Sequence, residues 1–316
     1  MRTIALEEHY ATASFLRGPG SWLASRAGVI EPIADLGDGR IAAMDEAGVD
    51  LAVLSLAAPG VEQLDGPKAV ELARECNDEL AAAVERYPGR LAGFASVPVS
   101  APDAAADELE RAMKELGFLG AVINGHSQGR YLDDPFFEPV LDRAASLGAP
   151  IYLHPTVPPA GVIESSYAGF APEVTFAFAT VGWGWHINTA THVLRLILGG
   201  VFDTYPDLQV IIGHMGEATS FMLPRFDATL KPELTGLKHP VSTYLRRNLH
   251  YTFANFNDEA TYANLVANVG IDRVAFSADY PFGSMTTARA FLDKLPLTDD
   301  ERARISHRNA EKLLGL

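Results

Sequence analysis

The sequence contains a single cysteine, Cys76, among its 316 residues. One thiol forms no disulfide within the chain, so disulfide-stapled folds and cysteine-based metal sites are excluded. No run of about 18 uninterrupted apolar residues occurs, and the first ten residues, MRTIALEEHY, include two acids where a signal peptide needs an apolar stretch. We therefore expect a cytoplasmic protein without a membrane partner.

Basic residues are few relative to acidic ones. Lys and Arg number 25 against 40 Asp and Glu, which gives a net charge of −15, and no Lys/Arg cluster reverses this charge locally. Such a chain repels phosphate backbones, so nucleic acid is excluded as a partner. The remaining composition, 48% hydrophobic and 21% charged, is typical of a globular protein with a sizeable core. We expect residues 1–316 to form one domain.

Short apolar runs alternate with segments of helical periodicity along the whole chain. This alternation predicts repeated strand and helix units around a parallel sheet. Many of the runs lack polar alternation, as is typical of strands that are covered on both faces. The eight predicted strands are Thr3–Glu8, Asp50–Leu56, Leu91–Val97, Leu119–Asn124, Pro150–His154, Leu208–His214, Leu249–Phe253 and Arg273–Ala278.

Helix-ending signals stand between these runs. The segments Arg40–Ala47, Asp103–Leu116 and Asp134–Leu147 are each followed by a glycine suited to the left-handed position after a helix. Thr298–Glu301 has the pattern of a capping box that starts a last helix. Eight strands with helices between them favour an α/β fold of the (β/α)8 TIM-barrel class over a doubly wound open sheet.

Two long segments interrupt the alternation, Ala11–Gly39 and Thr156–Gly184. Both are rich in Gly, Pro, Phe and Trp, and loops this long in a domain usually carry function or contact a partner. The second segment follows the fifth predicted strand, so we expect a long loop insertion over the carboxyl-terminal mouth of the barrel. Its aromatic content is too high for a solvated loop and predicts a lid or a subunit contact.

The first predicted strand ends in residues able to bind a metal ion, at the end of the barrel where such enzymes build their sites. Glu7 and His9 are two residues apart and face the same side of the strand, while Glu8 faces the other. We therefore expect His9→Ala to abolish activity and Glu8→Gln to cause a much smaller loss of activity.

Later strands end in similar residues. His154 ends the fifth strand, His214 ends the sixth, and Asp279 follows the eighth. Each of them alone is better explained as a hydrogen-bonded polar residue at a strand end, but their joint placement favours a metal site. Glu7, His9, His154 and Asp279 supply two carboxylates and two imidazoles, which suit one divalent ion, Zn²⁺ or Mn²⁺.

Four motifs occur in a fixed order: Ala-Leu-Glu-Glu-His, Tyr-Leu-His-Pro, Ile-Gly-His-Met-Gly-Glu and Phe-Ser-Ala-Asp-Tyr-Pro-Phe. Through them the chain resembles, over nearly its whole length, the amidohydrolase-related decarboxylases. These include γ-resorcylate, 2,3-dihydroxybenzoate and aminocarboxymuconate semialdehyde decarboxylases. Most members of the wider amidohydrolase superfamily begin with His-x-His, whereas Glu-x-His here is similar to the hydroxybenzoate branch. The resemblance implies that Glu7, His9, His154 and Asp279 bind the metal.

The resemblance also implies the reaction, which is nonoxidative decarboxylation of a small hydroxy-aromatic carboxylic acid without an organic cofactor. In this scheme the substrate carboxylate and its ortho hydroxyl chelate the ion. Asp279 protonates the ring carbon that loses CO2, and His214 and Glu217 assist. Glu217 stands three residues after His214, so we expect it to fix the imidazole ring by a hydrogen bond. The resemblance further implies a homo-oligomer, a dimer or a tetramer.

Other functions and other binding residues stay open. The same ligand set serves hydrolysis of an amide, lactone or ester, and a barrel without activity can serve as a binding partner. Asn124 and His126, near the end of the fourth strand, and Arg225, on the helix after the sixth, are candidates for binding a substrate carboxylate or hydroxyl. Relatives often have Glu where this chain has Asn188, for which we expect a structural role, with an effect on substrate choice as the alternative.

Overall fold

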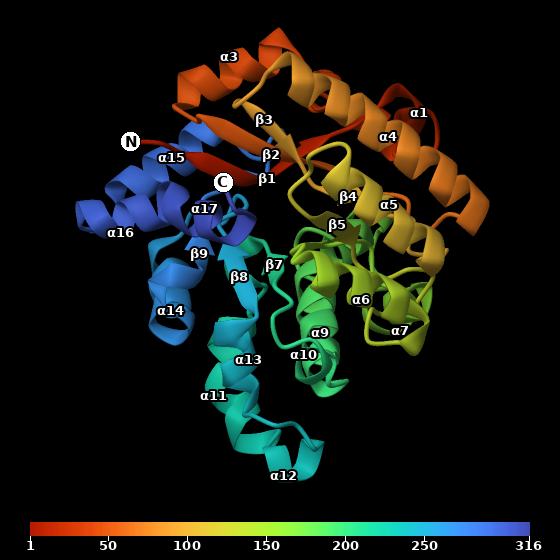
Figure 1. The fold of residues 1–316 in the computed structure, drawn as a ribbon. Coiled ribbons are helices and arrows are strands. Elements are labelled where there is room, and N and C mark those ends of the chain that lie inside the picture. Colours follow the sequence, from red (N-terminus) through yellow and green to blue (C-terminus); the bar gives the residue numbers. More distant parts are fainter.

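Parallel strands form the centre of the structure, a computed structural model that describes residues 1–316 (Figure 1). Every predicted strand is present, and the third is divided into β3 and β4 on either side of Phe94. The strands are β1 (Ile4–Tyr10), β2 (Leu51–Leu56), β3 (Leu91–Gly93), β4 (Ala95–Ser96), β5 (Ala121–Asn124), β6 (Ile151–His154), β7 (Val210–Ile212), β8 (Leu249–Thr252) and β9 (Val274–Ala275).

The strands follow one another in chain order around the centre. They pair as a three-stranded sheet, β1-β2-β3, and a six-stranded sheet from β4 to β9. The Phe94 N–H bridges the two sheets by donating to the Leu54 carbonyl at 2.9 Å. At the other junction, Leu6 N–H donates to the Phe276 carbonyl at 3.1 Å, which places β1 beside the continuation of β9. The predicted (β/α)8 architecture is confirmed.

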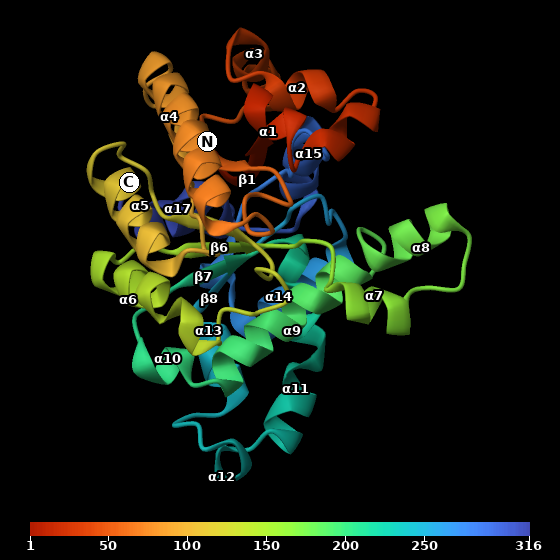
Figure 2. The ribbon, with the colours of Figure 1, turned by 90° about the vertical axis from the view of Figure 1, so that its right-hand side faces the viewer.

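Helices surround the strands on the outside (Figure 2). The α-helices are α1 (Ala13–Arg17), α2 (Ile30–Ala34), α3 (Asp38–Ala47), α4 (Gly66–Arg86), α5 (Pro102–Lys114), α6 (Glu138–Leu147), α7 (Ala160–Ser166), α8 (Pro172–Ala179), α9 (Gly184–Leu198), α10 (Val201–Thr204), α11 (Thr219–Thr229), α12 (Pro232–Thr235), α13 (Val241–Arg247), α14 (Glu259–Val269), α15 (Met285–Lys294), α16 (Asp299–Ala303) and α17 (Asn309–Leu314). Shorter turns are the 3₁₀ helices η1 (Ser21–Ser25), η2 (Pro135–Phe137), η3 (His214–Gly216) and η4 (Ile271–Arg273), and the π-helical η5 (Arg304–Arg308).

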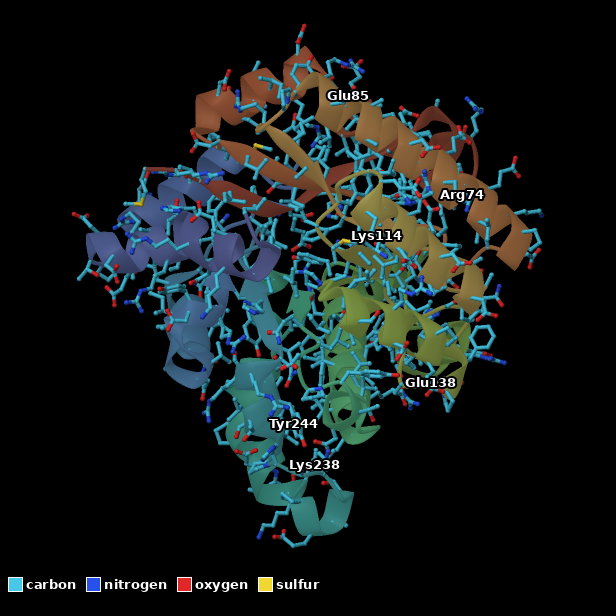
Figure 3. The ribbon with its side chains drawn as sticks, in the orientation of Figure 1. Arg74, Glu85, Lys114, Glu138, Lys238 and Tyr244 are labelled. Atoms are coloured by element: carbon cyan, nitrogen blue, oxygen red, sulfur yellow. The ribbon has the colours of Figure 1, made fainter.

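Most of the predicted helix signals are present, but α5 ends at Lys114, two residues before the predicted end at Leu116. Gly48 and Gly148 adopt the left-handed conformation after α3 and α6, and Thr298 and Glu301 form the capping box of α16. Charged side chains lie mainly on the outward faces of the helices, as on α4 and α5 in Figure 3. None of the helices is both long and apolar enough to cross a membrane.

Side chains of the strands divide between two apolar cores. The larger core of 67 buried residues fills the space between strands and helices. A smaller core of ten residues fills the barrel interior. Its members come from alternate positions of the strands, together with Ala310 of α17: Ile4, Leu6, Leu51, Val53, Phe94, Val122, Tyr152, Ile211, Ala275 and Ala310. This double burial explains why the strand sequences lack polar alternation.

A β-bulge in β1 decides which side chains face the barrel interior. Ala5 pairs with Ala52 but Glu8 pairs with Leu54, so β1 contains one extra residue between these pairs. Strict alternation from Leu6 would direct Glu8 inward and Glu7 and His9 outward. The extra residue reverses the alternation, and bulges of this kind redirect side chains next to active sites.

Both long segments contain short helices rather than continuous loop. Segment 11–39 includes α1, η1 and α2, and segment 156–184 includes α7 and α8. Large apolar side chains of the second segment remain exposed, among them Phe170 at 57% and Trp183 at 48%. Figure 2 shows α7 and α8 extending away from the barrel, as do α11 and α12 at another edge. These surfaces are suited to contacts with a further chain.

Candidate metal centre and active site

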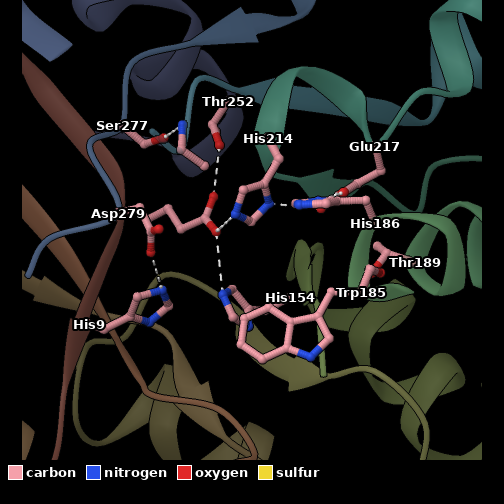
Figure 4. A network of polar contacts seen from close by, with 12 residues as sticks. His9, His154, Trp185, His186, Thr189, His214, Glu217, Thr252, Ser277 and Asp279 are labelled. Atoms are coloured by element: carbon pink, nitrogen blue, oxygen red, sulfur yellow. Dashed lines mark hydrogen bonds and ion pairs between the residues drawn. The ribbon is translucent and has the colours of Figure 1, made fainter. Parts of the chain in front are cut away.

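The four predicted metal ligands come together at the ends of β1, β6 and β9. One ligand atom from each of Glu7, His9, His154 and Asp279 lies within 4.8 Å of the others. His9 Nε2 is 3.2 Å from Asp279 Oδ1, and His154 Nε2 is 3.5 Å from Glu7 Oε1. Figure 4 shows the imidazoles directed into one space beside Asp279. The side chains are buried, which removes the water that would otherwise compete for these ligands.

Only one of the two carboxylate oxygens of Glu7 accepts hydrogen bonds, and the other has no partner. Its Oε2 accepts hydrogen bonds from the hydroxyls of Tyr152 and of Thr252, the latter at 3.0 Å. Its Oε1 is buried without a hydrogen-bond partner. Gly213 gives the carboxylate room, because a Cβ at this position would lie 2.3 Å from Oε2. An oriented carboxylate with one unpaired buried oxygen fits a metal ligand, since buried polar atoms otherwise find partners.

One ring nitrogen of each predicted histidine ligand is buried without a hydrogen-bond partner, Nε2 in His9 and Nδ1 in His154. His9 Nδ1 lies 3.2 Å from the Ser55 hydroxyl, and His9 Nε2 is buried without a hydrogen-bond partner. Burial holds the pKa of His154 well below its ordinary value, and the neighbouring His9 and His214 act in the same direction. His154 is therefore neutral near pH 7, which is the form that binds a metal ion.

A second cluster adjoins the ligands. His214 Nδ1 contacts Glu217 Oε1 at 2.8 Å, as predicted, and His186 Nδ1 contacts Glu217 Oε2 at 2.5 Å. Burial lowers the pKa of His214, but the carboxylates of Glu217 and Glu7 outweigh burial and raise it to about 10. Burial raises the pKa of Glu217, but the two histidines reverse this and lower it. His214 Nε2 is 4.0 Å from Glu7 Oε1, so the cluster is continuous with the predicted metal ligands.

The backbone that carries this cluster is unusual. His214, Met215, Glu217 and Ala218 all have positive φ between 51° and 63°. Each such residue costs of order 1 kcal/mol or more, and conformations of this kind persist where the surroundings impose them. They explain why β7 ends at Ile212, two residues before the predicted end at His214. His186 was not among the predicted site residues, although it stands only two residues before Asn188, the position where relatives often have Glu.

A cavity of about 330 Å³ opens beside the predicted ligands. His154, His214 and Asp279 line it, with Trp22 and Trp185 among the aromatic side chains of the opposite walls. Most of the lining residues are hydrophobic. A small apolar pocket with a few convergent polar groups suits a small aromatic ligand. Trp22, from segment 11–39, was not among the predicted site residues, although that segment was expected to carry function.

The three substrate-binding candidates lie outside the lining of this cavity. The Asn124 N–H donates to Glu62 Oε1 at 2.6 Å, which ties its backbone to the segment after β2. His126 Nε2 contacts the Val157 carbonyl at 3.1 Å, and its Nδ1 accepts from a backbone N–H. Arg225 is exposed on α11. Within one chain, Asn124 and His126 thus make hydrogen bonds to neighbouring segments, and none of the three residues lines the cavity beside the predicted ligands.

Asn188 has the structural contact that was expected of it. The side chain is 7% exposed, and its Oδ1 accepts a hydrogen bond from the Tyr131 hydroxyl at 2.7 Å. Asn188 does not line the cavity. Its side chain therefore joins α9 to the segment after β5.

Comparisons with known proteins agree with this geometry. A family profile described as amidohydrolase matches residues 22–316. The chain is 36% identical to decarboxylase orsB of Emericella nidulans, over 98% of this chain and 96% of that protein. It is 34% identical to a gamma-resorcylate decarboxylase of Polaromonas sp., over 99% and 98% of the two chains. A crystal structure of a dihydroxybenzoic acid decarboxylase from Polaromonas sp., with bound manganese and the inhibitor 2-nitroresorcinol, matches with a TM-score of 0.88 at 32% identity and covers 100% of this chain and 97% of that one.

Proposed function

Because this chain belongs to the amidohydrolase family, we propose that it is a metal-dependent carboxy-lyase that decarboxylates a small hydroxy-aromatic carboxylic acid. The observation that carries the proposal is the convergence of Glu7, His9, His154 and Asp279 at an apolar cavity of about 330 Å³. The similarity to decarboxylases over nearly the full length of the chain supports the same reaction.

The proposed cofactor is one divalent ion, Mn²⁺ or Zn²⁺, held by these four residues. Two carboxylates and two imidazoles suit either ion. The bound manganese of the Polaromonas structure favours Mn²⁺. The ion that these residues would hold would supply Lewis-acid stabilisation of negative charge on the substrate oxygens.

Asp279 is the proposed proton donor. Its proton forms the new C–H bond at the ring carbon that bears the carboxylate. The bond from this carbon to the carboxylate then breaks, the electron pair restores the aromatic ring, and CO2 leaves. A proton from solvent restores the acid. Asp279 is 9% exposed and lines the cavity, so it contacts both the ligand space and the route to solvent.

His214 and Glu217 are the proposed assisting residues. Glu217 fixes the His214 ring through Nδ1, so that Nε2 is available as a hydrogen-bond donor to a substrate oxygen. The aromatic side chains of the cavity exclude water and pack against the substrate ring. Asn124 and His126 act on binding through the segments they support. Arg225 is exposed on α11 and contacts substrate only if a partner subunit or a movement brings it to a cavity.

The proposed quaternary structure is a homo-oligomer of single-domain, cytoplasmic subunits. Exposed apolar side chains support it, since Phe221 of α11 is 73% exposed and Leu234 of α12 is 74% exposed. Phe170 and Trp183 form a second exposed group. Contact with another copy of the chain would remove this apolar surface from water.

Turnover in D2O tests the reaction. The protein is loaded with Mn²⁺ and incubated with candidate hydroxybenzoates, and the product is examined by NMR and mass spectrometry. We expect CO2 release and one deuterium on the ring carbon that lost the carboxylate, because the acid that protonates it exchanges with solvent. Hydrolysis of an amide, lactone or ester leaves every carbon unlabelled. A product without a new C–D bond would therefore exclude decarboxylation and favour hydrolysis as the reaction.

A further inference from the structure

Glu8 points away from the barrel interior, but its side chain contacts the backbone on both sides of Asp279. Glu8 is fully buried on the outer face of β1. Its Oε1 accepts a hydrogen bond from the Ala278 N–H at 2.8 Å, and its Oε2 accepts one from the Tyr280 N–H at 3.0 Å. The two donors belong to the residues on either side of Asp279, so both oxygens of Glu8 are used to hold the segment that carries a predicted ligand.

The backbone of Asp279 needs such support. Asp279 has a φ of +62°, in the left-handed region that non-glycine residues rarely adopt. Its own N–H donates to the Glu7 carbonyl at 2.8 Å. Three successive N–H groups, at 278, 279 and 280, are thus all held by Glu7 and Glu8. The two N–H groups on either side of the left-handed residue thus converge on the single carboxyl group of Glu8.

Arg40 extends the same cluster to His9. The Arg40 side chain is fully buried, and its Nη2 donates to the His9 carbonyl at 2.7 Å. Its guanidinium lies 5.1 Å from the centre of the Tyr280 ring, within the range of a cation–π contact. The Tyr280 carbonyl in turn accepts the His9 N–H at 2.7 Å. The outer face of β1 therefore holds the backbone of His9 and that of Asp279 together.

We infer that Glu8 is a positioning residue that holds Asp279 in its left-handed conformation, and thereby sets the distance between Asp279 and His9 across the metal site. The inference rests on the proposed metal ligands and not on the identity of the substrate. It replaces the expectation that Glu8→Gln is mild. Glu8 does face away from the barrel interior, as predicted, but a residue on that face acts on the site through the backbone.

Glu8→Gln is the test, because the amide keeps the size of the side chain and one acceptor oxygen. The NH2 group of the glutamine would face the N–H of Ala278 or of Tyr280. Both groups are donors, so one of the two hydrogen bonds is lost. We expect Mn²⁺ affinity, measured by calorimetric titration of metal-free protein, to fall about 10- to 100-fold. With saturating Mn²⁺ we expect kcat to fall about tenfold or more while KM changes less, because proton transfer depends on Asp279.

Glu108→Gln is the matched control. Glu108 is a buried glutamate on α5 that accepts hydrogen bonds from Asn77 and Arg111, away from the predicted ligands. We expect it to lower stability without changing Mn²⁺ affinity or kcat. If Glu8→Gln binds Mn²⁺ and turns over as the wild type does, or if the two variants show equal losses of affinity, the inference is wrong. The calorimetric result does not depend on turnover, so it separates this inference from the proposed reaction.

Hydrogen exchange of the wild-type protein provides a second test if Glu8→Gln does not fold. Mass spectrometry of a peptide covering residues 276–283 reports the amides of 278, 279 and 280. Because Glu7 and Glu8 hold these amides, we expect protection in metal-free protein to be nearly the same as in Mn²⁺-loaded protein. Free exchange of these amides in metal-free protein, with protection only after Mn²⁺ is added, would overturn the inference.

Discussion

Protonation of the buried Glu62, which contacts Asn124 at the end of β5, makes a quantitative prediction about how stability depends on pH. The side chain is fully buried, its Oε1 accepts the Asn124 N–H at 2.6 Å, and its Oε2 has no hydrogen-bond partner. Burial raises the pKa of Glu62 to about 7 from the ordinary 4.5, although the hydrogen bonds from Asn124 act in the opposite direction. The Asn124 Oδ1 is also a buried acceptor without a partner. A protonated Glu62 paired with a rotated Asn124 amide would satisfy both groups.

The sign of the pH effect follows from the protons bound in each state. Between pH 4.5 and pH 7 the folded chain keeps the Glu62 proton and the unfolded chain loses it. The free energy of unfolding therefore falls as the pH rises through this window, and the contribution is fully present only below pH 4.5. The two pKa values differ by 7 − 4.5 = 2.5. At about 1.4 kcal/mol for each unit, the contribution lost is roughly 3 kcal/mol.

Glu62→Gln separates this effect from all other titrations. The amide does not titrate and keeps an acceptor for the Asn124 N–H. We expect the free energy of unfolding of the variant, relative to the wild type, to rise by about 3 kcal/mol between pH 4.5 and pH 7.5. Urea unfolding at four pH values across this range measures it. Ser127→Ala is the control, because it removes a hydroxyl that donates to the Glu62 carbonyl without removing a titratable group. A difference between Glu62→Gln and the wild type that is independent of pH would refute the reasoning.

Two further predictions concern the metal ligands. Tyr152→Phe removes the hydroxyl that donates to Glu7 Oε2, so we expect Mn²⁺ affinity to fall about 10- to 100-fold, measured by titration of metal-free protein. An unchanged affinity would show that Thr252 alone orients Glu7. Elemental analysis of the purified protein should give one divalent metal ion per chain, since Glu7, His9, His154 and Asp279 form a single group. Two ions per chain would show that His186, His214 and Glu217, which form the other group of metal-capable residues, also bind one.

The sequence was sufficient to predict the series of strands and the convergence of Glu7, His9, His154 and Asp279. Strand runs and strand-end polar residues depend on local composition, so positions such as His154 at the end of β6 were predictable. Substrate contacts depend on how distant segments meet. Trp22 reaches the cavity because η1 lies over the barrel mouth, and no local pattern indicates that contact. Asn124 stood at the expected strand end, but the segment after β2 supplies Glu62 as its partner.

The β-bulge in β1 is a structural feature that the sequence pattern does not reveal. The prediction that Glu7 and His9 face inward is confirmed, although the alternation that places Ile4 and Leu6 in the barrel interior would turn both outward. One extra residue between Ala5 and Glu8 resolves the conflict, because it lets Leu6 and Glu7 both face inward. The bulge also turns Glu8 toward Arg40 and the segment of Asp279. A single irregularity thus turns two predicted ligands inward and, between them, turns outward the residue whose carboxyl group accepts hydrogen bonds from the segment of a third.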